Sequence, residues 1–243
     1  MDAMPRDKQK QTGAHLTPKP LADLVAHRLS QQLWRFEGPI RILDPACGDG
    51  NLLVAMVQAL PAEARRRNTL VGIEDDIESF DIVTRRLATM EDIPPADLRK
   101  GEFLDLVDDG TMFQLPLLIN PVDVVIANPP YVRTQVLGAP RAQHLAAKFG
   151  LEGRVDLYQA FLVAMAEVLR PGGVPGVITS NRFLTTKAGV STRRFLRSQF
   201  DLLEIVDLGD TKLFGAAVLP ALIFGVRRSV PRRSDEAMHA EFT

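Results

Sequence analysis

The segment Val122–Tyr131, with the sequence VDVVIANPPY, constrains the fold of this chain more than any other. Its first part, Asp123–Ile126, predicts a buried parallel strand, because a short apolar run of this kind suits a strand covered on both faces. Two prolines, Pro129 and Pro130, then prevent either a strand or a helix from continuing. A stiff loop must therefore follow the strand at its carboxyl end, which is where open α/β sheets carry their functional groups.

This loop carries two hydrogen-bond acceptors beside an aromatic ring. Asn128 offers an amide oxygen, Pro129 a carbonyl oxygen, and Tyr131 a flat aromatic face. Two acceptors next to a ring suit a planar group that bears an NH2. Both a nucleobase with an exocyclic amine and a side-chain amide are such groups. A turn whose tyrosine packs on its own loop would have the same local sequence, so a second motif is needed to decide.

A glycine-rich loop, Asp44–Asn51, provides that second motif. It lies between the short apolar strand Ile40–Leu43 and a helical pattern from Leu52, an arrangement that brings backbone N–H groups close to a ligand. Its spacing differs from the GxGxxG of dinucleotide-binding loops, and no lysine follows to hold a phosphate. The carboxylate of Asp44 would repel a pyrophosphate but attract a cation. The loop therefore favours S-adenosylmethionine, which carries a sulfonium and an ammonium, over a dinucleotide.

The composition indicates one large domain with a full core, since the chain has 243 residues and 46% of them are hydrophobic. Residues 1–14 are polar and predict a disordered leader rather than a signal peptide, and the apolar runs are too short for a transmembrane helix. A single cysteine fits a reducing cytoplasm, where we expect the protein to reside. The formal net charge of −1 means that any contact with nucleic acid depends on local basic patches.

Acidic and aromatic residues follow the next two predicted strands. Glu74 ends the strand Leu70–Ile73, where a carboxylate is placed to accept hydrogen bonds from ribose hydroxyls. Glu102 and Phe103 stand side by side after a third strand. They can bracket an adenine, with the acid bound to its amino group, although a surface glutamate beside a core phenylalanine would have the same sequence.

The rest of the chain continues the alternation of helices and strands and ends with two strands, Leu203–Leu208 and Leu219–Val226. This order predicts a three-layer α/β sandwich with a terminal hairpin, formed by one domain over residues 15–228 and followed by a polar tail over residues 229–243. The segment 182–197 contains basic residues and no acid. Such a segment is typical either of a solvated face or of a surface that faces a phosphate backbone.

The order of these motifs resembles that of the S-adenosylmethionine-dependent amino-methyltransferases. More narrowly, it is similar to that of the adenine-specific DNA methyltransferases of the γ class, the Eco57I/TaqI-like group. The shared order is a His-x-Thr-Pro segment, the loop DPACGDG, an acidic second strand and NPPY, and the resemblance extends from His15 to Arg227. It implies a class I, Rossmann-like fold with a seven-stranded, mostly parallel sheet and a C-terminal β-hairpin.

The resemblance also implies a role for each matching residue around the cofactor. Thr17 and Pro18 would close over the methionine part, and Glu74 would hold the ribose. Glu102 and Phe103 would bind the adenine. The family usually has an aspartate at the position of Glu102. The further cofactor contacts that the resemblance implies are Asp44, Ala46, Cys47, Gly48, Asn128 and Phe161.

By the same resemblance, the expected activity is methyl transfer from S-adenosylmethionine to the N6 amine of an adenine flipped out of double-stranded DNA, in a restriction-modification or phage-defence setting. The two aromatic rings of the implied site would hold the base between them. The residues implied for this chemistry are Asn128, Pro129, Pro130, Tyr131 and Phe214. The basic residues expected on the DNA are Arg133, Arg182, Lys187 and Arg193. No metal is expected to take part.

Other functions share parts of this pattern. A protein glutamine-N5 methyltransferase or an RNA amino-methyltransferase would use the same loop on another NH2, and a non-catalytic subunit would only bind S-adenosylmethionine. The His-x-Thr-Pro segment and the basic segment favour DNA, and the intact NPPY favours catalysis. Cytosine-C5 chemistry needs a cysteine nucleophile beside the base, whereas the single cysteine, Cys47, lies in the cofactor loop.

Enzymes of this group normally continue into a target-recognition domain, and this sequence ends just after the last predicted strand. We therefore expect a missing C-terminal domain, a separate specificity subunit or another DNA-binding partner. We also expect weak, salt-sensitive DNA binding by this chain alone, because its basic residues form only local patches. No membrane partner is expected.

Overall fold

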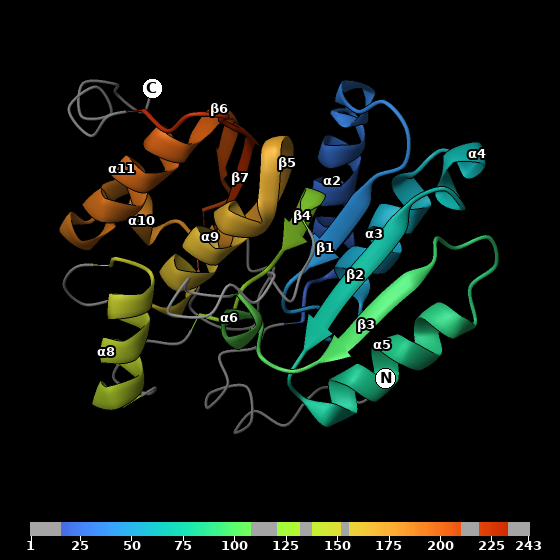
Figure 1. Cartoon of the computed structure of the whole chain (residues 1–243), viewed down its shortest axis with the longest axis horizontal. Helices are drawn as coiled ribbons and strands as arrows, with labels where there is room; N and C mark the ends of the chain where they lie inside the picture. The colour runs from blue at the N-terminus through green and yellow to red at the C-terminus, as the bar shows by residue number, and fades with distance from the viewer. Residues whose placement is uncertain (1–15, 108–120, 132–137, 152–155, 210–218, 233–243) are drawn as a thin grey trace.

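A computed structural model of the chain describes residues 16–107, 121–131, 138–151, 156–209 and 219–232 (Figure 1). The strands of its sheet are β1 (Arg41–Asp44), β2 (Thr69–Glu74), β3 (Ala96–Lys100), β4 (Val122–Ala127), β5 (Leu169–Ser180), β6 (Phe200–Asp207) and β7 (Pro220–Arg227). The seven strands have the order β3-β2-β1-β4-β5-β7-β6. The first five of this order run parallel, whereas β7 lies antiparallel to both β5 and β6. The fold class expected from the sequence is confirmed.

Helices cover both faces of this sheet, which gives the three layers (Figure 1). One face carries α2 (Lys19–Ser30), α3 (Asn51–Ala59) and α5 (Ile77–Ala88), with the short elements η1 (Leu33–Arg35) and α4 (Ala62–Arg65) in the connections. The other face carries α6 (Phe103–Leu106), α8 (Ala139–Lys148), α9 (Leu157–Val168), α10 (Arg182–Thr185) and α11 (Val190–Gln199), with η2 (Lys187–Gly189) between the last two.

The central strand β4 is buried at every position because each face of the sheet is covered. Its side chains alternate between the faces. Val124 and Ile126 pack with α2 and α3, whereas Val125 and Ala127 pack with α9. The apolar run that predicts a buried strand in the sequence is thus explained by two separate cores.

The first helix begins later than the sequence indicates. The sequence predicts Thr17 as its N-cap and Pro18 as its first helical residue. In the structure, Pro18 is the N-cap, with an extended backbone at φ −59° and ψ 141°, and α2 begins at Lys19. The hydroxyl of Thr17 instead accepts a hydrogen bond from Asn128, at the carboxyl end of β4. A tertiary contact has replaced the expected local cap.

Two further elements differ from the expectation. The sequence of residues 132–157 predicts a long loop, whereas the structure has the helix α8 there, which begins after Gly138 with a proline in its first turn. The strand β5 begins at Leu169, directly after α9, so the Pro-Gly-Gly sequence that follows lies within the strand. Its pairing with β4 shifts register between Val122 and Val124, and this irregularity accommodates the extra residues.

The contact of α2 with β5 depends on Gly176. A Cβ atom at this position would lie 2.8 Å from both Cγ and Cδ1 of Leu29. We therefore expect Gly176→Ala to lower the free energy of unfolding by about 1–3 kcal/mol, because overpacking forces the helix away from the sheet. Combining it with Leu29→Ala should cost less than the sum of the two single changes. Urea unfolding measures both effects.

Thr179→Val provides the matched control on the same strand. Thr179 is fully buried, and its hydroxyl has no hydrogen-bond partner among the described residues. The change keeps the shape of the side chain and removes no hydrogen bond, so it should leave stability unchanged or raise it slightly. Equal losses for Thr179→Val and Gly176→Ala would contradict the steric explanation.

Candidate functional site

Two neighbouring strands at the centre of the sheet, β1 and β4, end at residues of the predicted site. Asp44 is the last residue of β1, and Asn128 directly follows β4. The two strands are parallel, with Leu43 opposite Val125. The strand order reverses its direction between them, because β2 and β3 lie beyond β1 while β5 lies beyond β4. Such a switch point leaves a crevice outside the carboxyl ends of the strands, so the two predicted loops meet at one edge of the sheet.

The carboxyl group of Asp44 is fully buried and only half satisfied. Its Oδ1 accepts a hydrogen bond from the backbone N–H of Ala46 at 3.2 Å, whereas Oδ2 has no partner among the described residues. Burial raises the pKa of Asp44 to about 8, and the nearby carboxylates of Glu74 and Asp49 add to this rise. A buried acid with a free oxygen is a good partner for a cationic ligand.

The glycine-rich loop after β1 is a tight turn whose backbone conformation favours glycine at two positions. Gly48 and Gly50 both have positive φ, at 55° and 84°. A Cβ atom on Gly50 would also lie 2.6 Å from Cγ2 of Val83 on α5. Cys47 is buried in the core under this loop, and burial raises the pKa of its thiol, so it stays protonated and packs as an apolar side chain.

Glu74 ties this loop to the end of β2. Its Oε2 accepts a hydrogen bond from the N–H of Gly48 at 2.7 Å, and its Oε1 accepts one from the N–H of Asp76 at 2.9 Å. Burial raises the pKa of Glu74 to about 7. Each carboxylate oxygen has a second lone pair. Glu74 can therefore hold the loop in place and still accept a hydrogen bond from a ligand hydroxyl.

The predicted adenine residues lie after β3. Phe103 is 1% exposed, and its ring packs on that of Phe161 with centroids 5.6 Å apart. Glu102 is partly exposed and forms an ion pair at 2.6 Å with Arg141 of α8, which also contacts Asp105. The sequence predicts a loop around Arg141 and gives no signal for this contact, because Arg141 and Glu102 lie 39 positions apart.

Asn128 is held at both ends of its side-chain amide. Its Nδ2 donates a hydrogen bond to Oγ1 of Thr17 at 3.1 Å, and its Oδ1 accepts one from the hydroxyl of Tyr131 at 2.7 Å. Both Asn128 and Thr17 are buried. Burial also raises the pKa of Tyr131, so its hydroxyl stays protonated and can donate. The amide is thus fixed at the point where the predicted chemistry requires an acceptor.

A second asparagine, Asn51, links the N-terminal segment to the cofactor loop. Its Nδ2 donates to the carbonyl oxygen of Thr17 at 3.0 Å and to Oδ2 of Asp49 at 3.1 Å. Its Oδ1 accepts a hydrogen bond from Nη1 of Arg86 at 2.7 Å. Neither Asn51 nor Arg86 is among the site residues that the sequence predicts. The position of Asn51 at the start of a helix, directly after a glycine, was the available signal.

The predicted DNA-binding residues have different surroundings. Arg182 and Lys187 are exposed just beyond β5, next to the carboxyl end of β4. Arg193 instead donates hydrogen bonds from Nη1 to the carbonyl oxygens of Phe183 and Thr186, which ties α11 to the turn after α10. Two predicted residues, Arg133 and Phe214, lie outside the described residues.

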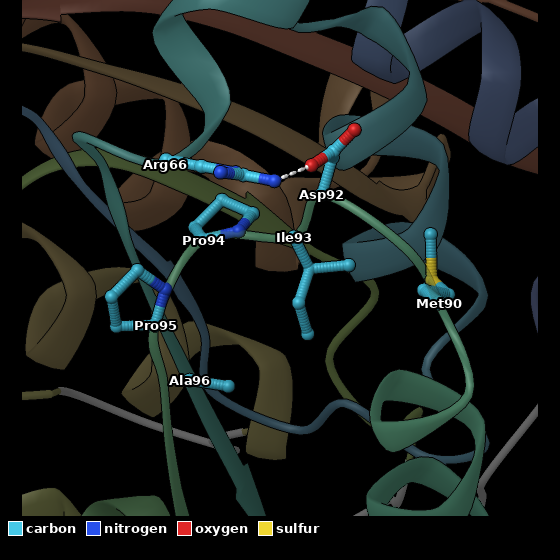
Figure 2. A pocket seen from close by; sticks show the side chains of 7 residues that line it. All are labelled: Arg66, Met90, Asp92, Ile93, Pro94, Pro95 and Ala96. Atoms are coloured by element: carbon cyan, nitrogen blue, oxygen red, sulfur yellow. Dashed lines mark hydrogen bonds and ion pairs between the residues drawn. The ribbon is translucent and has the colours of Figure 1, made fainter.

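An open surface pocket of about 530 Å³ lies at the opposite edge of the sheet. It is lined by Pro95 and Ala96 at the start of β3, with Met90 and Ile93 on its wall (Figure 2). An ion pair between Arg66 and Asp92 closes one side. None of the predicted site residues line it. Within the described parts of the chain, no group of three or more His, Cys, Asp or Glu side chains could hold a metal ion, and no helix is long and apolar enough to cross a membrane.

Comparisons with known proteins give the same family that the order of motifs resembles. Residues 96–214 match the family model of the Eco57I restriction-modification methylases. The chain is 51% identical over 229 residues to the type II methyltransferase M.BanIII of Aneurinibacillus aneurinilyticus, covering 91% of this chain and 39% of that protein. It is 27% identical over 213 residues to the type II methyltransferase M.XhoI of Xanthomonas vasicola, covering 82% of this chain and 38% of that protein. The chain thus spans about two fifths of the length of these relatives.

Among solved structures, a putative class I S-adenosylmethionine-dependent methyltransferase from Listeria monocytogenes superimposes with a TM-score of 0.70 at 21% identity, over 90% of this chain and 62% of that one. The fold described above is that of a class I S-adenosylmethionine-dependent methyltransferase, which implies S-adenosylmethionine as the methyl donor. Within this class, the resemblance to the Eco57I-like restriction-modification methylases is confirmed by the family model and by M.BanIII.

The described residues fit this cofactor. Asp44 presents an unsatisfied buried oxygen that suits a cationic group, and Glu74 retains acceptor capacity for a hydroxyl. Gly48, in the turn between them, has no side chain of its own to stand between a ligand and the backbone. The residues that we expect to hold the cofactor are those the sequence indicates, and their individual roles remain predictions.

The raised pKa of Asp44 predicts how stability depends on pH without cofactor. Between the ordinary pKa of 3.8 and the folded value of about 8, the folded protein binds a proton that the unfolded chain does not. The free energy of unfolding should therefore fall as the pH rises through this window, by at most about 1.4 kcal/mol per pH unit for this group. Glu74 contributes with the same sign up to its folded pKa of about 7.

Asp44→Asn should weaken this pH dependence, because the amide needs no proton to remain neutral. Urea unfolding of the cofactor-free protein between about pH 5 and pH 8 measures the slope. Glu91→Gln, which changes an exposed carboxylate far from the site, is the matched control and should leave the slope as in the unchanged protein. An identical slope for Asp44→Asn and the unchanged protein would show that the buried carboxyl does not titrate in this window.

Proposed function

We propose that this chain is the catalytic part of a cytoplasmic DNA methyltransferase of a restriction-modification system, and that it methylates the N6 amine of an adenine flipped out of double-stranded DNA. The observation that carries the proposal is the side-chain amide of Asn128, which is buried and hydrogen-bonded at both ends beside the loop that begins at Asp44. The similarity to M.BanIII, a type II methyltransferase, supports the restriction-modification setting.

The reaction needs acceptors rather than a strong base. The lone pair of an adenine amine is delocalised into the ring, so the nitrogen is a poor nucleophile. If Oδ1 of Asn128 and the carbonyl oxygen of Pro129 accept its two hydrogens, the nitrogen is drawn towards a tetrahedral form and its lone pair becomes available. The same acceptors stabilise the positive charge that develops on nitrogen. S-adenosylmethionine, when bound, supplies the electrophilic methyl group.

Tyr131 has two tasks in this proposal. Its hydroxyl donates to Oδ1 of Asn128, and an amide oxygen can accept two hydrogen bonds, so the same oxygen would also accept one from the amine. Its ring offers a face on which the extruded base can stack, worth about 1–3 kcal/mol, which offsets part of the cost of leaving the DNA helix. We propose Phe214 as the facing ring, on the strength of the sequence resemblance.

Asn128→Ala tests the catalytic assignment. It should lower the rate of methyl transfer at least about 100-fold, because an acceptor for developing charge is lost, while the affinity for S-adenosylmethionine changes little. The assay uses labelled S-adenosylmethionine with unmethylated duplex DNA, RNA and total protein in parallel, followed by nucleoside digestion of the product.

The matched control is Asn68→Ala, which removes another buried asparagine. Asn68 accepts a hydrogen bond from the N–H of Ile40 at 3.0 Å, at the opposite end of β1. It should lower stability without lowering the turnover of the folded protein. Equal loss of rate and cofactor affinity in Asn128→Ala would contradict the assignment. Label found as methylated glutamine in protein, or in RNA alone, would mean that the NPPY loop acts on that substrate instead of on DNA.

Target recognition is proposed to need a further domain or a separate specificity subunit, because this chain corresponds to 39% of M.BanIII. Residues 15–228 would form the catalytic domain of such an assembly. On this domain, the exposed side chains of Arg182 and Lys187 lie on the same edge of the sheet as Asn128. We propose that they contact the DNA backbone beside the flipped base.

Replacing Arg182 and Lys187 together with glutamine should weaken DNA binding and reduce the slope of log K against log salt by about 2, because about one counterion is released per contacted phosphate. Fluorescence anisotropy with labelled duplex at several salt concentrations measures this slope. The control pair is Arg66→Gln with Arg67→Gln, which removes the same charge near the pocket at the opposite edge (Figure 2). Equal reductions for both pairs would indicate general attraction rather than a defined surface.

A further inference from the structure

We propose that Thr17 is a positioning residue for this reaction, in addition to any contact with the cofactor. Its hydroxyl would hold the NH2 end of the Asn128 amide and so keep the oxygen end turned towards Tyr131 and the base. The inference rests on the function proposed above, since it concerns the group that accepts the amine hydrogens. Nothing in the local sequence of the NPPY loop indicates it, because the two residues are separated by 111 positions.

The amide of asparagine has two ends of nearly equal shape and opposite hydrogen-bonding character. When Oδ1 of Asn128 faces the base, it can accept a hydrogen bond from the adenine amine. If Nδ2 faced the base instead, the NH2 groups of the asparagine and of the adenine would both be donors, and the base could not bind. The hydrogen bond from Nδ2 of Asn128 to Oγ1 of Thr17, at 3.1 Å, places the oxygen at the other end. The hydroxyl of Tyr131 lies at that oxygen end, 2.7 Å from Oδ1.

Thr17 is itself well anchored, which a positioning residue requires. Its carbonyl oxygen accepts a hydrogen bond from Nδ2 of Asn51, whose Oδ1 is in turn held by Arg86 of α5. The next residue, Pro18, restricts the backbone of Thr17 to extended conformations, and its carbonyl oxygen accepts the first N–H groups of α2. Thr17 therefore connects the cofactor loop, the first helix and the catalytic loop.

Thr17 is 6% exposed and Asn128 is 9% exposed, so water cannot readily replace the hydroxyl. Removing the hydroxyl would take away an acceptor of this buried NH2 group. The amide would then be held less firmly, and the direction of its oxygen would be less well fixed. A small misplacement of this kind can cost about 100-fold in rate without loss of substrate affinity.

The first arm of the test reads the hydrogen bond without any substrate. In protein labelled with nitrogen-15, the side-chain NH2 signals of Asn128 are identified by their absence in Asn128→Asp. Their exchange with solvent should be slow in the unchanged protein and in Thr17→Ser, and at least about 10-fold faster in Thr17→Val. Unchanged exchange in Thr17→Val would overturn the inference, because it would mean that the NH2 end does not face Thr17.

The second arm measures methyl transfer to DNA together with the affinity for S-adenosylmethionine. Thr17→Val should lower kcat about 10- to 100-fold with little change in cofactor affinity, and Thr17→Ser should restore most of the rate. A loss of cofactor affinity with kcat unchanged would show that the hydroxyl serves only the cofactor, which would overturn the positioning role.

Thr192→Val is the matched control, since it removes an equivalent buried bond elsewhere. The hydroxyl of Thr192 on α11 accepts a hydrogen bond from Nε2 of Gln159 on α9 at 2.8 Å. This variant should lose similar stability and yet keep the exchange of the Asn128 NH2 and the kcat of the unchanged protein. An equal fall of kcat in both variants would attribute the effect to stability and overturn the inference.

The two arms also separate this inference from the proposed function. If the unchanged protein methylates glutamine in protein, the adenine assignment fails, and the first arm still decides whether Thr17 holds the amide. If adenine is methylated and exchange in Thr17→Val is unchanged, the function stands and the positioning role fails.

Discussion

The parallel pairing of β1 with β4 is the constraint on which the rest of the site depends. Because parallel neighbours end at the same edge of a sheet, this pairing brings Asp44 and Asn128 together from positions far apart in the chain. Core packing on both faces of these strands fixes their register, and the prolines after β4 stiffen the loop beyond it. The polar residues need only project from strand ends that the apolar residues have already placed.

Around this frame, the polar contacts of the site connect segments that are distant in sequence. Thr17 is hydrogen-bonded to both Asn51 and Asn128, and Glu74 connects the glycine-rich loop after β1 to the end of β2. Each connection uses a buried or half-buried side chain that is hydrogen-bonded within the protein, and such bonds are costly to break. Asp44 is different, because one of its oxygens is left without a partner among the residues described. The site is thus rigid where it holds protein groups and open where a ligand would enter.

Much of this could be predicted from the sequence because it depends on local patterns. Apolar runs, glycine spacing and prolines indicated the strands, the turn and the fold class, and the order of motifs indicated the family resemblance. The start of α2, the helix α8 and the role of Arg193 at the end of α10 could not be predicted in the same way. Two of these depend on a partner far away in the chain: Thr17 bonds Asn128 rather than its own helix, and Arg141 of α8 pairs with Glu102. Arg193 instead binds backbone carbonyls seven and ten residues before it. Local propensity cannot encode a tertiary contact.

The carboxyl group of Asp44, of which one oxygen has no hydrogen-bond partner among the described residues, has a consequence for the binding and release of ligands. A buried acid that holds a proton near neutral pH would give it up when a cation arrives, so ligand entry becomes an exchange of one positive charge for another. The interior then keeps nearly the same net charge before and after binding. If the ligand is S-adenosylmethionine, its uncharged thioether product would attract the carboxylate less strongly, and the proton could return. A single buried acid would in this way favour the substrate form of the cofactor over its spent form.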